Sequence, residues 1–239
     1  MTHLRSKIAL LLAVVIALTT VPALASTAGA TGRPAPTTSQ VWVTHGLPLD
    51  DSGTVVDVYV DGALTIEDFT FGQTVGPLTL PVATYGIQVK LANTDTVAID
   101  QAVTVPAGGN FSVVASYTDA DGALGLNVFS NDLSKIRRHT ARVALHHAAA
   151  APAVDVDAAL TRYPLFRATP VTGAVNGQQA VVTVPSWLRY DFDVRVAGTD
   201  TTVLSLDAVK FQGRRLTNVY VVGSAAGGTL QAVTSVIKP

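Results

Sequence analysis

Apolar and polar residues alternate along most of this chain. In residues 55–62, VVDVYVDG, valines alternate with Asp57, Tyr59 and Asp61, so the valines would share one face of a strand. Residues 190–196, YDFDVRV, repeat the pattern with charged residues on the outer face. Both stretches predict half-buried β-strands, in which exposure to solvent is enough to explain the charged side chains.

Valine-rich runs of this kind continue from about Val41 to the end of the chain, and they stop at turn signals such as Asp-Gly, Gly-Gly and Asn-Gly. No segment keeps a helical period. We therefore predict an all-β protein made of two tandem antiparallel immunoglobulin-like β-sandwich domains, with about seven short strands in each. A single barrel formed from both halves is a less economical alternative.

The two halves repeat one order of motifs. VWVTHGLP at 41–48 corresponds to RVALHHAA at 142–149, which aligns His45 with His146. VVDV then follows in the first half and AVDV in the second. This repetition predicts two copies of one domain.

The N-terminus has the features of a signal peptide. Basic residues near the start precede an apolar run and an Ala-Leu-Ala cleavage pattern, so we expect residues 1–25 to be removed. The apolar run is shorter than the roughly 20 residues that a membrane span needs. The rest of the chain is predicted to divide into a flexible linker at 26–39, a first β-sandwich at 40–131, a connector at 132–140 and a second β-sandwich at 141–239.

Charge and cysteine content limit the partners and the cellular location that we expect. The chain contains no cysteine, so an exported form must be held together by its cores without disulfides. With 16 basic and 17 acidic residues, the net charge of −1 gives no electrostatic reason to expect nucleic acid or anionic lipid as a partner. No later segment is apolar for long enough to span a membrane. We expect a secreted protein that is extracellular or associated with the cell wall.

The order of these motifs resembles the bacterial secreted family called domain of unknown function 4397. In the first half the resemblance rests on His45, Pro48, VDVYVDG, Phe71-Gly72, Leu80-Pro81 and Tyr85. The second half keeps His146, Pro152 and AVDV, but DAALTRYPLF stands in place of YVDG. The resemblance implies a sandwich module of envelope and surface proteins, and it implies no particular activity.

Histidine and carboxylate side chains are the candidates for chemistry, because zinc sites and acid–base pairs use them. The candidate binding-loop or structural residues are His45, Asp50, Asp51, Asp57, His146, His147 and Asp155. One histidine and one aspartate per copy are too few for a typical zinc site, and no His-Glu-x-x-His motif is present. We therefore assign no metal, cofactor or catalytic residue. Each aligned histidine is expected to end the first strand of its copy and to hydrogen-bond the loop that follows.

Two further patterns have plain structural explanations. DADG at 119–122 resembles part of a calcium loop, but a hairpin turn accounts for it. Trp42, Trp187 and Tyr59 would form a sugar-stacking platform if exposed, although Trp42 is expected in the core.

Together these features favour a non-enzymatic binding or structural module at the bacterial cell envelope, with a cell-wall or surface component as partner. The recognition loops would be residues 46–54 and 147–152, which follow the aligned histidines. One alternative is a metal-assisted hydrolase with a site between the copies, using His45 with His146 or His147. A passive spacer is the other. No Gly-x-Ser-x-Gly and no phosphate-binding glycine loop is present.

Overall fold

The computed structural model describes residues 36–47 and 54–239, and in this part the chain forms strands joined by turns, without a helix. No helix capable of crossing a membrane is therefore found among these residues. The strands are β1 (Thr38–His45), β2 (Val55–Val60), β3 (Ala63–Thr70), β4 (Thr74–Pro81), β5 (Ala83–Leu91), β6 (Val97–Val105), β7 (Asn110–Tyr117), β8 (Leu124–Ser130), β9 (Thr140–Ala150), β10 (Val154–Leu160), β11 (Tyr163–Ala174), β12 (Gln179–Pro185), β13 (Tyr190–Val196), β14 (Thr202–Val209), β15 (Leu216–Ser224) and β16 (Gln231–Ile237).

These strands form four sheets, two in each half of the chain. The first sandwich pairs the sheet β4-β1-β7-β8 with the sheet β3-β2-β5-β6, and the second pairs β12-β9-β15-β16 with β11-β10-β13-β14. The two orders are identical when the first eight strands are matched in sequence to the second eight. The all-β fold of two repeated sandwiches is thus confirmed, and four separate sheets take the place of the alternative single barrel.

The detail differs from the sequence prediction in two respects. Within residues 36–47 and 54–239, each copy has eight strands rather than about seven. One pair per copy is parallel, β1 with β7 and β9 with β15, whereas the other pairs are antiparallel. The hairpin of the second copy that lacks YVDG still forms, because Leu160 pairs with Tyr163 across a two-residue turn just as Val60 pairs with Ala63.

Alternation of side chains builds a core inside each sandwich. On β2, Val56 and Val58 are buried while Asp57 and Tyr59 are half-buried on the outer face. On β13, Phe192 and Val194 are buried and Asp193 is half-buried on the outer face. The predicted faces of both strands are therefore correct, and each sandwich holds one continuous apolar core.

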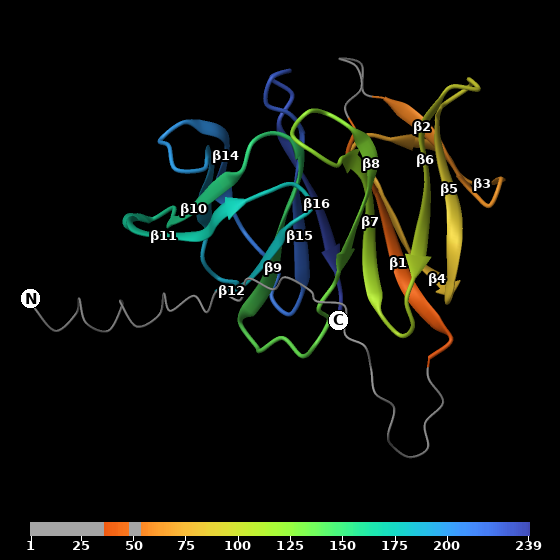
Figure 1. The fold of residues 1–239 in the computed structure, drawn as a ribbon. Coiled ribbons are helices and arrows are strands. Elements are labelled where there is room, and N and C mark those ends of the chain that lie inside the picture. Colours follow the sequence, from red (N-terminus) through yellow and green to blue (C-terminus); the bar gives the residue numbers. More distant parts are fainter. Residues whose placement is uncertain (1–35, 48–53) are drawn as a thin grey trace, which may run out of the picture.

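The two sandwiches pack against each other through one sheet from each. Figure 1 shows the four sheets as successive layers, with β2, β3 and β5 at one end and β10, β11 and β14 at the other. Aliphatic and aromatic side chains from both copies meet in the middle. The buried contact residues are Val114, Phe129, Ala148, Tyr220, Val222 and Val233. In a second, smaller cluster, Trp42 of the first copy and Leu133 of the connector pack against the second copy. Their contact residues there are Ala144, Leu216 and Ile237.

Buried amides cross the same interface. Asn218 on β15 donates through Nδ2 to Oδ1 of Asn131 at 2.9 Å, and Asn131 donates to the Ser112 hydroxyl at 2.9 Å. Since buried polar groups are costly when unpaired, this network favours one relative placement of the two sheets. The copies are therefore held in a defined orientation by both apolar and polar contacts.

Candidate functional site

His45 clamps the loop that leads from β1 to β2. Its side chain is fully buried. Its Nδ1 accepts a hydrogen bond from the Leu47 amide at 3.3 Å, and its Nε2 lies 3.1 Å from the Thr54 carbonyl, next to the start of β2. Because a carbonyl only accepts, the ring is the neutral tautomer with hydrogen on Nε2.

His147 makes the same contacts in the second copy. Its Nδ1 accepts from the Ala149 amide at 3.4 Å and its Nε2 donates to the Pro152 carbonyl at 3.1 Å. The backbone contacts also match, since the carbonyl oxygens of His45 and His147 accept from Gly72 and Gly177. The counterpart of His45 is therefore His147, and the sequence alignment of His45 with His146 is wrong by one residue.

His146 has a different place, because neighbouring residues of a strand point to opposite faces. It faces the interface between the sandwiches, with its ring centroid 4.3 Å from that of Phe129 and 4.6 Å from that of Tyr220. Its Nε2 donates to Oδ1 of Asn218 at 3.2 Å. His146 thus belongs to the packing between the copies, and the structure does not join it to His45.

Burial makes all three histidines weak bases. Desolvation lowers the pKa of His45 to about 4, partly offset by the hydrogen bond to Thr54. It lowers the pKa of His146 to about 4, offset in part by Asn218, and it also lowers the pKa of His147. Neutral, buried and hydrogen-bonded rings are suited to holding structure, and at neutral pH they are not in the imidazolium form that acts as a general acid.

Asp57 and Asp155 hold matching bulges in the edge strands. Asp57 on β2 accepts from the backbone amide of Asp68 at 3.0 Å, and Asp155 on β10 accepts from that of Gly173 at 2.7 Å. Both donors have a left-handed backbone, with φ of 49° at Asp68 and 61° at Gly173, and both sit where the strand pairing shifts. The repeated aspartate is therefore a support for a β-bulge.

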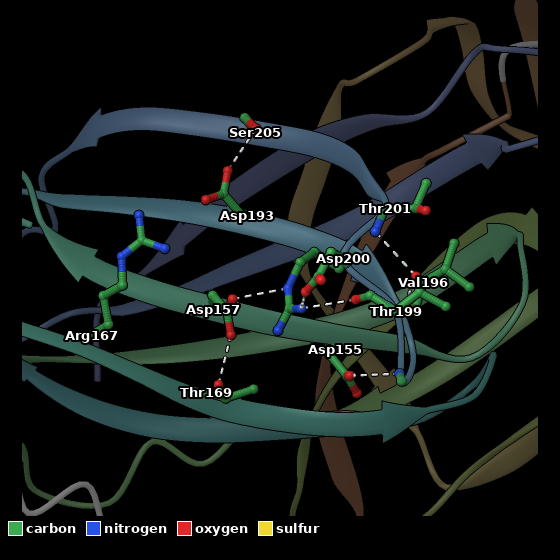
Figure 2. A network of polar contacts seen from close by, with 12 residues as sticks. Asp155, Asp157, Arg167, Thr169, Asp193, Val196, Thr199, Asp200, Thr201 and Ser205 are labelled. Atoms are coloured by element: carbon green, nitrogen blue, oxygen red, sulfur yellow. Dashed lines mark hydrogen bonds and ion pairs between the residues drawn. The ribbon is translucent and has the colours of Figure 1, made fainter.

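Asp155 also joins a polar network on the outer face of the second sandwich (Figure 2). Its other oxygen accepts from the Gly198 amide at 2.9 Å, and these two backbone hydrogen bonds lower its pKa. Arg195 on β13 forms ion pairs with Asp157 at 2.9 Å and Asp200 at 3.3 Å, while Thr169 donates to Asp157. The carboxylates of this face are thus paired with arginine, hydroxyl or backbone donors.

The remaining sequence candidates do not assemble a site. Asp50 and Asp51 lie outside the described residues. In the described ranges, no three histidine, cysteine or acidic side chains are grouped as a metal site would require. Asp119 accepts from the amides of Asp121 and Ala123, which makes DADG a turn. The stretch at 147–150 is not an exposed recognition loop, because it belongs to β9 and is buried.

The three aromatic residues of the predicted sugar-stacking platform lie in different parts of the fold. Trp42 packs in the interface between the sandwiches. Tyr59 lies on the outer sheet of the first copy, with Lys90 Nζ 4.6 Å from its ring centroid. Trp187, in the turn before β13, is 66% exposed. These three aromatic residues therefore do not form one surface.

One exposed feature was missed by sequence reasoning. In the pairing of β10 with β11, Ala159 faces Arg167 while the next residue, Leu160, faces Tyr163. Residues 164–166 therefore bulge out of the edge strand, and Leu165 is 96% exposed. Tyr163 is 51% exposed and packs edge-on against Phe166 with ring centroids 6.2 Å apart. The departure of DAALTRYPLF from the repeat was the only signal for this segment, which we call the apolar bulge (Tyr163–Phe166).

The histidines of the two clamps and the two aspartates that support the bulges lie within a segment that a family model matches. The model described as "Domain of unknown function (DUF4397)" matches residues 39–157. These residues belong to the DUF4397 family. The match includes His45, Asp57, His147 and Asp155, so the DUF4397 segment contains both copies of the histidine clamp and both bulge-supporting aspartates. The apolar bulge lies outside this segment, shortly after its end.

Comparison with solved structures returns weak likenesses over most of the chain. A candidate cell adhesion protein of Bacteroides uniformis is 13% identical, with a TM-score of 0.28, and the alignment covers 82% of this chain and 96% of that one. A candidate adhesin of Bacteroides ovatus is 12% identical, with a TM-score of 0.25 and coverage of 83% and 93%. A fimbrial anchor protein of Porphyromonas gingivalis is 9% identical, with a TM-score of 0.23 and coverage of 83% and 97%. TM-scores this low establish no shared function, and no curated protein matches the chain in sequence.

Proposed function

We propose that this protein is a secreted, non-enzymatic binding module of the bacterial cell envelope, and that the apolar bulge of the second sandwich is part of its binding surface. The observation that carries the proposal is the near-complete exposure of Leu165. An apolar side chain held in solvent by an insertion in an edge strand contributes nothing to the core. A partner that covers it would explain why the insertion is there.

The surroundings of the bulge suit a wall polymer or surface protein. Arg162 and Arg167 flank it, and Tyr163 offers an exposed ring for stacking on a sugar or an apolar side chain. The turn before β13 is linked to this hairpin, because the Thr161 amide donates to the Arg189 carbonyl at 3.1 Å. Trp187 lies in that same turn and is exposed.

A non-enzymatic role is supported by the places of the candidate catalytic groups. His45 and His147 are buried where they hydrogen-bond the backbone of the following loop, and His146 is buried in the interface between the sandwiches. Asp57 and Asp155 are engaged with backbone amides. Each of these residues is engaged in a structural contact, which favours a non-enzymatic role.

The test is co-sedimentation of the purified exported protein with isolated bacterial cell-wall sacculi. We expect saturable pelleting, weakened at least tenfold by Leu165→Ser and by Tyr163→Ala. Neither change should disturb folding by more than about 0.5 kcal/mol, since both side chains are exposed. Val97→Ser is the matched control, because Val97 is 44% exposed on β6 of the first sandwich and lies far from the bulge in the chain.

Pelleting of the control but not of the bulge variants would support the proposal. If the unaltered protein does not pellet, the wall-binding proposal is wrong, and the protein is better explained as a passive spacer. Equal pelleting of Leu165→Ser and the unaltered protein would show that binding uses another surface.

A further inference from the structure

Each sandwich encloses an apolar cavity between its two sheets, and the two cavities differ in size. The cavity in the first sandwich has a volume of about 290 Å³, whereas that in the second has about 140 Å³. In the first, the inner walls come from valines of the central strands, including Val56, Val89 and Val113. The larger cavity is therefore a property of one copy and not of the shared topology.

Aromatic side chains account for the smaller cavity. Tyr190, Phe192 and Phe211 are buried in the second sandwich, with ring centroids 5.9–6.2 Å apart. Tyr190 has a counterpart in Tyr85, since both hydroxyls donate to a proline carbonyl at the end of the preceding strand, at Pro185 and Pro81.

The other two rings have no aromatic counterpart in the first copy. Register places Ile87 of β5 where the second copy has Phe192, because each lies two residues after the equivalent tyrosine on the strand that pairs with β2 or β10. Phe211 follows β14, whereas Pro106 and Ala107 follow β6. The first sandwich thus lacks two rings that fill the core of the second, although it buries the Phe69 ring of β3.

The larger cavity reaches the surface between the edge strands β3 and β4. Among its lining residues on these strands, Ile66, Leu78 and Leu80 are half-buried and Thr65 is exposed, while the Phe69 ring is buried deeper between the sheets. The lining residues on the central strands β2, β5 and β7 include fully buried valines. The cavity is therefore a blind apolar pocket with its mouth at one edge of the sandwich.

The lining chemistry selects the ligand. Among its lining residues only Thr65 and Tyr85 carry polar side-chain atoms, and none carries a charge. The Tyr85 hydroxyl already donates to Pro81 at 3.0 Å. Walls that are mostly aliphatic, with the Phe69 ring and without charged groups, favour a hydrocarbon chain over a sugar, a nucleotide or a charged peptide. An acidic or polar head group would remain in solvent at the mouth.

We infer that the first sandwich binds an aliphatic chain, such as the acyl chain of a fatty acid or a membrane lipid, in the pocket between its two sheets. This site lies in the other sandwich from the apolar bulge, and it does not rest on the proposed wall binding. It would give the protein a second ligand of a different chemical class.

The test is titration of the purified protein with the fluorescent fatty acid 11-(dansylamino)undecanoic acid. We expect saturable binding with a blue-shifted emission, and displacement by dodecanoate. Ile87→Phe places in the pocket the ring that the second copy carries, so it should weaken binding at least tenfold while leaving the protein folded. Leu80→Phe, at the mouth, is the second blocking variant if Ile87→Phe does not fold.

Two controls separate this site from other apolar surfaces. Leu165→Ser removes the most exposed apolar side chain and should leave the titration unchanged, so that failure of the wall-binding proposal does not affect this result. Phe192→Ile enlarges the cavity of the second copy and should not reduce binding in the first.

The source of the chain is distinguished by a parallel experiment with phospholipid vesicles. Extraction of a fluorescent phospholipid would assign the pocket to membrane lipid, whereas binding of the free acid alone would assign it to unesterified fatty acid. Lack of saturable binding to either, or equal binding by the unaltered protein and both blocking variants, would overturn the inference.

Discussion

The two sandwiches share every strand pairing, but they differ in the side chains that fill the core and in the shape of one edge strand. The second copy buries Tyr190, Phe192 and Phe211 in its core and carries the apolar bulge on its edge strand, whereas the core of the first copy has Phe69 and a larger pocket. The histidine clamp and the aspartate-supported bulge are the same in both. The comparison therefore separates residues that maintain the frame from residues that are free to specialise.

The frame residues all satisfy backbone groups. His45 and His147 connect two loop positions, while Asp57 and Asp155 each hold an amide at a shift in strand pairing. Such contacts set the path of the chain without filling the core, so the core and the edges can change around them.

Acidification should cause the largest loss of stability, because both copies bury neutral histidines. The pKa of His45 and of His146 is about 4 in the folded protein, against 6.5 when exposed. Below pH 6.5 the unfolded chain binds protons that the folded chain does not, so stability is complete above pH 6.5 and falls as the pH drops toward 4. We expect a loss of roughly 3 kcal/mol for each of these two residues, and a further loss from His147, from the relation of 1.36 kcal/mol per pKa unit. Urea unfolding at pH 7 and pH 4.5 measures it.

His146→Gln is the control for this effect. Glutamine keeps a donor toward Asn218 and does not titrate, so the variant should lose part of the pH dependence while the two clamps keep theirs. An unfolding free energy that stays constant between pH 6.5 and 4.5 would contradict the assignment of three buried neutral rings.

Truncation of the cores should be the next largest effect and should differ between the copies. Phe192→Ala removes a buried ring from the core of the second sandwich and should cost about 3–5 kcal/mol. Ile87→Ala, at the equivalent position beside the larger pocket, should cost about 2 kcal/mol, since fewer contacts are lost around a half-buried side chain. Chemical unfolding monitored by circular dichroism gives both values. Equal losses would mean that the first core is as tightly packed as the second.

Removal of the bulge-supporting aspartates should have the smallest effect. Asp155→Ala loses two backbone hydrogen bonds and Asp57→Ala loses one. We expect about 1 kcal/mol for Asp155 and about half of that for Asp57, because solvent partly replaces the lost partners on this outer face. Hydrogen exchange of the Gly173 and Asp68 amides reports the local opening directly. A larger loss at Asp57 than at Asp155 would reverse the expected order.

Strand content could be predicted from sequence because it depends on local alternation. Val56 and Val58 of β2 and Phe192 of β13 lie inward as predicted, and the repetition of VDV marked the same strand in both copies. Sequence was less able to show which single residues correspond between the two copies. In the pair His146-His147 a shift of one residue exchanges the two faces of the strand, and only the contacts of the folded chain select His147 as the counterpart of His45.

The features that depend on distant parts of the chain could not be predicted. The interface joins Asn218 to Asn131 and Ser112, and the pocket depends on which side chains of two sheets meet across a core. The apolar bulge depends on a change of pairing between β10 and β11. No local pattern in the sequence encodes these distances.

The position of β1 has a mechanical consequence. β1 is the first strand of the described chain, yet it lies inside its sheet, with β4 on one side and β7 on the other. A force applied through the residues before Thr38 would have to break the ladders to both neighbours at once, whereas an edge strand could be peeled away along one. If the domain is attached through the residues before β1, pulling on that attachment would therefore have to unfold a central strand first, which requires more force than unfolding an edge strand.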